Sequence, residues 1–239
     1  MVQGQGVLRK MRFLTHEEVR AQFEGRQVCV VGSGPGVLDN PPGLIDGHDV
    51  VVRVNNYKLI PPVTGERCDV HYSFYGNSVR VSAEALARHG VRLCLCKCPN
   101  ADRVIESDWH RRNKKDHGVD FAWIYQLRER WWFCDAYVPH TKVFLEKFHL
   151  LGGRIPTTGF AAILDVLSWH PANVYLTGFD FFASRLHNVD EPWRDGSLDD
   201  PIRHAPDREL RWLAENLSRL PVTCDSRLMI ELAAGGSVK

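Results

Sequence analysis

Residues 30–36 read Val-Val-Gly-Ser-Gly-Pro-Gly, a short run of valines that ends in a turn rich in glycine. Because glycine has no side chain, such a turn lets backbone N–H groups come close to a phosphate or a nucleotide. A buried strand that runs into a glycine turn is typical of a Rossmann-like α/β fold. The stretch predicts that fold class and marks Gly32, Ser33 and Gly34 as candidate ligand contacts.

Further short apolar runs follow, and segments with helical spacing of apolar residues fall between them. Predicted strands cover residues 28–31, 50–54, 70–73, 91–96, 174–177 and 221–224, and predicted helices cover residues 15–23, 82–89, 140–150, 158–169 and 206–220. Apolar runs without alternation suit buried parallel strands, and strands that alternate with helices build a doubly wound sheet. Ligands bind such a sheet at the carboxyl ends of its strands.

The composition is that of one ordinary globular domain. The 239 residues include 30 basic and 29 acidic side chains, and the net charge of +1 argues against a nucleic-acid partner held by bulk charge. Hydrophobic residues make up 44%, which excludes disorder. We expect a leader segment over residues 1–24 and one domain over residues 25–239. The sequence contains no apolar run of about 18 residues that could span a bilayer.

Seven cysteines cannot all pair within one molecule, which favours reduced thiols and a cytoplasmic protein. Residues 94–98 read Cys-Leu-Cys-Lys-Cys, and on a strand these thiols would share one face as small buried hydrophobes rather than as a metal site. Residues 100–132 are predicted to form a surface insertion. Its basic run, residues 110–115, favours a solvated face, with contact to an acidic glycan or peripheral attachment to the inner face of a membrane as alternatives.

A dinucleotide-binding enzyme is one alternative that the glycine turn leaves open. Such a fold expects a carboxylate at the end of the second strand to hold a ribose. Here residues 52–56 read Val-Arg-Val-Asn-Asn, without a carboxylate. An NAD or FAD oxidoreductase and a turn with no ligand at all both stay open on these residues alone.

Two segments together resemble a known motif. Residues 29–34, Cys-Val-Val-Gly-Ser-Gly, and residues 45–55, Ile-Asp-Gly-His-Asp-Val-Val-Val-Arg-Val-Asn, resemble the large sialyl motif of the sialyltransferases, glycosyltransferase family 29, and residues 63–67 resemble its tail. The resemblance implies that the glycine turn and Asn55 hold the donor nucleotide. The chain departs from the motif at Ser33, where the family has Asn, and carries one inserted residue near Pro35.

A second match follows in the same order as in the family. Residues 156–159, Pro-Thr-Thr-Gly, and residues 174–179, Val-Tyr-Leu-Thr-Gly-Phe, are similar to the small sialyl motif. Thr157 and Thr158 stand at the expected N-cap of an apolar helix, whose N–H groups and dipole favour a phosphate, although a cap without a ligand has the same sequence. The resemblance implies donor contacts from Thr157, Thr158, Gly159 and Gly178, and Asp180 is placed to reach ribose hydroxyls.

The third match is His204 followed by Glu209, which has the H-x4-E spacing of the family's very small motif. Pro206 suits the first position of a helix, which leaves His204 on the preceding loop. Five residues turn a helix by about 500°, so the two side chains would not share a helical face. We expect His204 to do chemistry and Glu209 to hold the loop or the helix end. His187 stands where the family carries a short H-Y motif, either as a phosphate or acceptor contact or as a surface histidine.

The resemblance extends over about residues 27–227 and implies a CMP-sugar-dependent glycosyltransferase. Such an enzyme is a single Rossmann-like domain of a variant GT-A type, with a parallel-rich twisted sheet flanked by helices. It would move a 2-keto sugar acid, sialic acid or Kdo, from its CMP ester to a hydroxyl of a glycan or glycolipid with inversion. His204 would be the general base, and the groups at residues 157–159 and His187 would stabilise the departing phosphate.

The resemblance implies neither a cofactor nor a metal, because CMP leaves as a monophosphate and Asp180 and Asp199-Asp200 do not form an Asp-x-Asp site. It also implies a disulfide whose cysteines match Cys29 and His170, and His170 cannot form it. A cytoplasmic enzyme without that bridge fits the synthesis of bacterial surface glycans such as lipopolysaccharide or capsule. A nucleotide- or glycan-binding module that retains the fold without turnover remains an alternative.

Overall fold

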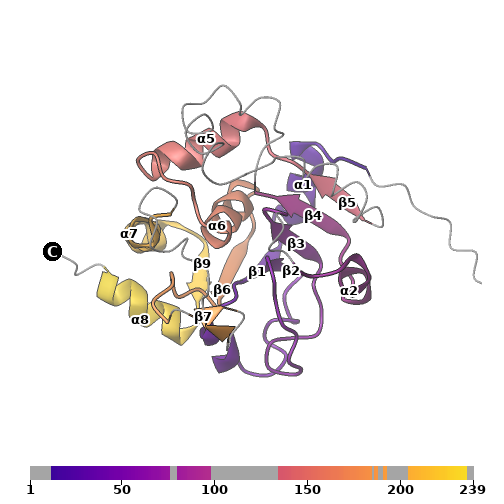
Figure 1. Cartoon of the computed structure of the whole chain (residues 1–239), viewed down its shortest axis with the longest axis horizontal. Helices are drawn as coiled ribbons and strands as arrows, with labels where there is room; N and C mark the ends of the chain where they lie inside the picture. Colours follow the sequence, from indigo (N-terminus) through magenta and orange to yellow (C-terminus); the bar gives the residue numbers. More distant parts are fainter. Residues whose placement is uncertain are drawn as a thin grey trace, which may run out of the picture.

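The computed structural model describes residues 12–75, 80–97, 134–184, 186–187, 191–192 and 204–235. The strands of its main sheet are β1 (Gln27–Val31), β2 (Val50–Val54), β3 (Val70–Ser73), β4 (Leu93–Cys96), β5 (Asp135–Tyr137), β6 (Asn173–Thr177) and β9 (Val222–Cys224). Over the described ranges these seven strands lie in the order β5-β4-β3-β2-β1-β6-β9 (Figure 1). Every neighbouring pair is parallel, so the predicted doubly wound α/β fold is confirmed.

Helices lie between the strands as the sequence predicted. They are α1 (His16–Phe23), α2 (Ala83–Arg88), α5 (Thr141–Leu150), α6 (Thr158–Ser168), α7 (Pro206–Asn216) and α8 (Ser226–Gly235), with 3-10 turns η1 (Pro35–Asp39) and η4 (Leu217–Arg219) and a small hairpin of β7 (Leu186–His187) and β8 (Glu191–Pro192). Every strand and helix that was predicted within the described residues is present. The sequence analysis missed β5, which has only three residues and begins with a carboxylate, and it missed α8.

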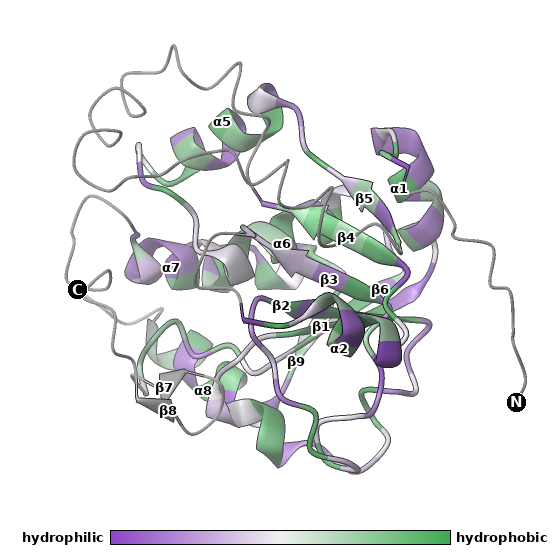
Figure 2. Cartoon of the chain, turned by 45° about the vertical axis from the view of Figure 1, so that its right-hand side comes forward, coloured by the Kyte–Doolittle hydropathy of each residue, from purple (hydrophilic) through white to green (hydrophobic). Residues whose placement is uncertain are grey.

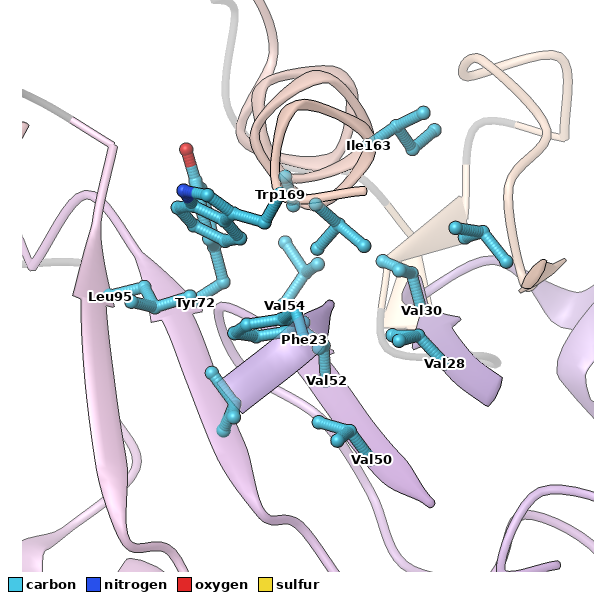
Figure 3. Close-up of a cluster of buried hydrophobic side chains, with 14 of the residues drawn as sticks. Phe23, Val28, Val30, Val50, Val52, Val54, Tyr72, Leu95, Ile163 and Trp169 are labelled. Carbon is cyan, nitrogen blue, oxygen red and sulfur yellow. The ribbon is translucent and has the colours of Figure 1, made fainter. Parts of the chain in front are cut away.

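Successive side chains of each strand point to opposite faces of the sheet, and helices cover both faces, so both faces are buried. Val28 and Val30 of β1 join the main core, whereas Cys29 and Val31 face a second cluster beside η1. Figure 3 shows the valines of β1 and β2 gathered with Ile163 of α6 and its C-cap residue Trp169. Helices α1, α6, α7 and α8 contribute to the main core, and α2 covers the opposite face. In Figure 2, β4 is hydrophobic along its length, as expected for a strand covered on both faces.

The first described segment packs into the same core. Val19 and Phe23 of α1 are fully buried there, and Thr15 caps the helix with the predicted capping box. The N–H of Leu14 donates to the carbonyl of Ala136 in β5 over 2.8 Å. Residues 12–24 therefore pack against the domain, residues 1–11 lie outside the described residues, and the boundary between leader and domain stays a prediction.

Charged residues of the first motif hold a loop against the sheet. The buried guanidinium of Arg53 donates to the carbonyls of Thr64 over 2.6 Å and Arg67 over 2.8 Å. The carboxylate of Asp46 accepts from the N–H of Glu66 over 2.7 Å. These side chains stabilise the path of the chain between β2 and β3, so this part of the motif is architectural.

The cysteines of β4 share one face, as predicted. Cys94 and Cys96 are buried with Cys68 and Cys134 in the cluster that α2 covers. Burial raises the pKa of the Cys94 thiol well above its usual value, which disfavours the reactive thiolate. Cys98, the insertion at residues 100–132 and its basic run lie outside the described residues.

The described ranges contain neither a membrane-spanning helix nor a cluster of metal-ligating side chains. None of the described helices has the length and apolar character needed to cross a bilayer. The described ranges also contain no group of three or more His, Cys, Asp or Glu side chains that could ligate a metal.

A buried ion pair joins α5 to α6 and gives a test of the core. Lys147 pairs with Asp165, whose other oxygen accepts from the Tyr72 hydroxyl over 2.5 Å. Asp165→Leu leaves the ammonium buried without its counter-ion, so we expect a loss of about 3–5 kcal/mol in the free energy of unfolding, measured by urea denaturation. The double variant Lys147→Met/Asp165→Leu should recover most of that loss. A single variant as stable as the double variant would contradict this role of the pair.

Candidate active site

The site begins where β1 and β6 end, at the point where the strand order reverses. Strands β2 to β5 lie on one side of β1, and β6 and β9 lie on the other (Figure 1). In open α/β sheets ligands bind in the crevice at such a point. Here the glycine turn after β1 meets Gly178 after β6: Gly34 N–H donates to the Gly178 carbonyl over 2.8 Å, and a Cβ at Gly32 would lie 2.3 Å from that oxygen.

Phe179 connects the glycine turn to the start of α6. Its ring would lie 3.3 Å from a Cβ at Gly32 and 2.8 Å from a Cβ at Gly159. Both glycines therefore make room for one ring. The two predicted glycine-containing motifs come together through this contact.

Asp180 follows directly and lies against Gly34, where a Cβ would be 3.3 Å from the carboxylate. Its oxygens accept from the N–H groups of Phe182 over 3.0 Å and Ser184 over 3.2 Å. Phe181 and Phe182 have φ values of 47° and 67°, which bulky residues rarely adopt. The carboxylate thus stabilises a strained turn at the crevice, and its predicted contact with a ribose stays a prediction.

The start of α6 is built around Thr157. As predicted, its hydroxyl caps the helix by accepting from Phe160 N–H over 3.1 Å. Its own N–H and O–H both donate to the buried carboxylate of Glu209, over 2.6 and 2.7 Å. Both donors of Thr157 are therefore engaged by Glu209, and its predicted contact with the donor substrate stays a prediction. The N–H groups of Thr158 and Gly159, the first two residues of α6, are the remaining candidates at this helix end.

Three consecutive residues before α6, Ile155, Pro156 and Thr157, are each held by a different side chain; we call them the strap. His204 Nδ1 lies 2.9 Å from the Ile155 carbonyl, and Lys97 Nζ lies 2.9 Å from the Pro156 carbonyl. Glu209 binds Thr157 as described above. The strap brings His204 and Glu209 to the start of α6, so all three predicted motifs meet in one region.

The carboxyl of Glu209 is fully buried, and this burial raises its pKa to about 7. The two hydrogen bonds from Thr157 and the positive charge of Lys97 act in the opposite direction, while Asp207 adds to the rise. Both bonds from Thr157 need an oxygen that accepts, which the ionised carboxylate supplies twice. Protonation of Glu209 turns one of these oxygens into a hydroxyl, which accepts more weakly and needs an acceptor of its own, so it weakens the hold on the strap.

His204 stands on the loop before α7, and Pro206 opens that helix, as the sequence predicted. A carbonyl oxygen only accepts, so the bond to Ile155 places the proton of a neutral imidazole on Nδ1. Nε2 then carries the lone pair that can take a proton.

Asn55 has φ of 51° and is fixed by its neighbours on β3. Its N–H donates to Tyr72 over 2.9 Å, its carbonyl accepts from His71 Nε2 over 2.8 Å, and its amide oxygen accepts from Ser73 Oγ over 2.9 Å. The amide nitrogen is the group with which Asn55 can donate to a ligand. Ser33 is half-buried in the glycine turn beside β1.

The side chain of His187 and the pair Asp199-Asp200 lie outside the described residues, and only the backbone of His187 is placed, in β7. The sequence analysis missed Asp225, which accepts from Gly178 N–H over 2.9 Å and caps α8 through Leu228 N–H over 2.7 Å. An Asp just before a helix is an N-cap signal that could have found it. It also missed Lys97, a lone lysine after an apolar strand.

Comparison with known proteins places this fold. No protein-family model matches the chain, and no curated protein matches it in sequence. A mammalian sialyltransferase in complex with Gal-beta-1-3GalNAc-ortho-nitrophenol is similar with a TM-score of 0.52 and 16% identity, over 84% of this chain and 69% of that one. The sialyltransferase CstII from Campylobacter jejuni, in complex with CMP-3FNeuAc, is similar with a TM-score of 0.54 and 13% identity, over 84% and 81%. The chain therefore has the fold of the sialyltransferases.

The buried Glu209 makes stability depend on pH. Between its ordinary pKa of 4.5 and about 7, the folded chain retains a proton that the unfolded chain has lost. The contribution of Glu209 to stability is therefore full below pH 4.5 and falls by about 3 kcal/mol as the pH rises through this window. Glu209→Gln should lack this decrease, which chemical denaturation at pH 5 and pH 7.5 would reveal. Equal pH dependence in both proteins would contradict the raised pKa.

The contact between Gly32 and Gly178 gives a second prediction. We expect Gly32→Ala to lower the free energy of unfolding by about 3 kcal/mol, because its Cβ would overlap backbone that cannot move aside easily. Gly43→Ala is the control: its Cβ meets nothing within 4 Å, and only its φ of 79° opposes a side chain. We expect about 1 kcal/mol for the control. Equal losses in urea denaturation would show that the close approach has no special cost.

Proposed function

We propose that this chain transfers a 2-keto sugar acid from its CMP ester to a hydroxyl of a glycan, with inversion and with His204 as general base. The observation that carries the proposal is the bond between His204 Nδ1 and Ile155, which fixes the imidazole beside the start of α6. The fold adds support, because solved proteins that share it are sialyltransferases in complex with CMP-3FNeuAc and with CMP.

His204 is suited to take a proton from the acceptor. With its proton on Nδ1, the imidazole can accept the proton of the acceptor hydroxyl at Nε2 while that oxygen attacks the anomeric carbon. The bond from the anomeric carbon to the phosphate oxygen breaks on the opposite face, and its electron pair leaves with CMP. The configuration at the anomeric carbon therefore inverts.

The leaving phosphate gains negative charge in this step. The N–H groups of Thr158 and Gly159 point from the positive end of the eleven-residue helix α6, which favours an anion there. The amide nitrogen of Asn55 adds a donor for the nucleotide, and the hydroxyl of Ser33 in the glycine turn adds another. Gly32, Gly34 and Gly178 bring the two strand ends together at this place. This arrangement can stabilise a departing monophosphate without a divalent ion, so we propose a reaction that needs neither metal nor cofactor.

Sialic acid is the first donor to test, and Kdo is the second, because both travel as CMP esters. The proposed acceptor is a glycan or a glycolipid, and no nucleic acid is expected as a partner. We further propose a cytoplasmic enzyme, with peripheral attachment to a membrane as the alternative.

The base assignment is tested by His204→Ala. We expect CMP release from CMP-sialic acid or CMP-Kdo, with a panel of glycan acceptors, to fall by about 10²–10⁴-fold, while the Kd of CMP changes by less than about two-fold. His149→Ala, which removes an exposed histidine of α5, is the matched control and should retain wild-type turnover. Wild-type turnover in His204→Ala would refute the role of His204 as base.

Two further measurements separate the alternatives. Turnover that persists in EDTA supports the metal-independent reaction, and a loss restored by magnesium or manganese would point to another class of glycosyltransferase. Titration with CMP, NADH and FAD should show binding of CMP alone. A wild-type chain that binds CMP but releases none from any donor would be the non-catalytic module.

A further inference from the structure

Lys97 is a buried lysine that the proposed reaction does not use. It follows β4 directly, and its side chain is 6% exposed. Its backbone N–H donates to the Ser73 carbonyl over 2.9 Å, which continues the ladder between β3 and β4, and its Nζ reaches the Pro156 carbonyl over 2.9 Å. Burying an ammonium group is costly unless its charge and its hydrogen bonds are compensated. The compensation here lies in the strap and in Glu209.

Lys97 binds Pro156, the middle residue of the strap. Pro156 stands between Ile155, which binds His204, and Thr157, which binds Glu209. Proline has no N–H, so its carbonyl is the only backbone group through which this residue can be held. The three bonds come from two separate parts of the chain, the end of β4 and the start of α7 with the loop before it, and each fixes one residue of the strap.

The positive charge of Lys97 also acts on the carboxyl of Glu209. Among the described residues, the groups that act on this carboxyl are Thr157 with two hydrogen bonds, Lys97 with its positive charge, and Asp207 of the same helix with a negative charge. Lys97 is the only cation among them. Its charge favours the ionised carboxylate, which accepts both bonds from Thr157.

We propose that Lys97 is a positioning residue that fixes the strap, and through it the His204 imidazole, by binding Pro156 and by balancing the buried charge of Glu209. The inference rests on the proposed function, because it assigns His204 the role of base. Without the ammonium, Glu209 binds a proton more readily, and its protonated oxygen accepts more weakly from Thr157. The strap then loosens, and Ile155 no longer fixes the proton of His204 on Nδ1.

The test is the pH profile of kcat for CMP release in Lys97→Met, Glu209→Gln and the double variant. Lys97→Met should lower kcat at pH 7 by about ten-fold and shift the acidic limb of the profile to higher pH by about one unit. In the Glu209→Gln background, the Lys97→Met change should move the limb no further. Lys142→Met, which removes an exposed charge of α5, is the matched control and should leave the limb in place.

The outcomes separate two ways in which Lys97 can act. An unmoved limb in Lys97→Met overturns the proposal. A limb that moves equally in the wild-type and Glu209→Gln backgrounds also overturns it, because Lys97 would then act on His204 directly. Lys97→Gln retains a donor for Pro156 and loses the charge, so it gives the same test if Lys97→Met fails to fold.

A readout without substrate distinguishes this proposal from the proposed function. Chemical denaturation between pH 5 and pH 9 should show that the decrease in stability with rising pH extends to higher pH in Lys97→Met than in the wild type. No such difference should appear between Glu209→Gln and the double variant. If the wild type releases no CMP from either donor, the proposed function fails, while these curves still decide whether Lys97 balances Glu209. Identical curves for the wild type and Lys97→Met would refute that coupling.

Discussion

The approach of two backbones, at Gly32 and Gly178, is the constraint on which the site depends. The two residues meet where β1 and β6 end, and a Cβ at Gly32 would lie 2.3 Å from the Gly178 carbonyl oxygen. Since a side chain cannot be inserted there, the ends of the two strands stay in direct backbone contact. Asp225 holds the N–H of Gly178, and Phe179 then packs between the glycine turn and α6. The start of α6 is placed by this chain of contacts.

The strap holds the proposed base, His204, at the start of α6. Ile155, Pro156 and Thr157 form no regular structure of their own, and each is bound by a side chain from elsewhere in the fold. A segment held at three successive residues has little freedom, which suits a site whose base must be oriented before the substrate arrives. The same bonds bury a carboxyl and an ammonium group, and buried charges of this kind concentrate at functional sites.

The first motif shows that a sequence pattern mixes architecture with chemistry. Arg53 and Asp46 lie within it, and both bind the backbone of the loop between β2 and β3. Only its glycine turn and Asn55 reach the carboxyl end of the sheet. A charged residue in a recognised motif is therefore not by itself evidence of contact with a ligand. A buried charged residue that donates to backbone carbonyls produces the same sequence pattern.

The sequence by itself determined most of the strands and helices, though not β5 or α8, because these elements depend on neighbours within a few residues. It also determined the order of the three motifs and local features such as the Thr157 cap and Pro206 at the start of α7. Tertiary structure alone decided that Thr157 donates to Glu209, 52 residues away, that Lys97 reaches Pro156, 59 residues away, and that Asp225 holds Gly178, 47 residues away. The partner of a buried polar group depends on which strands become neighbours in the sheet. That order follows from the packing of the whole chain, and no local pattern encodes it.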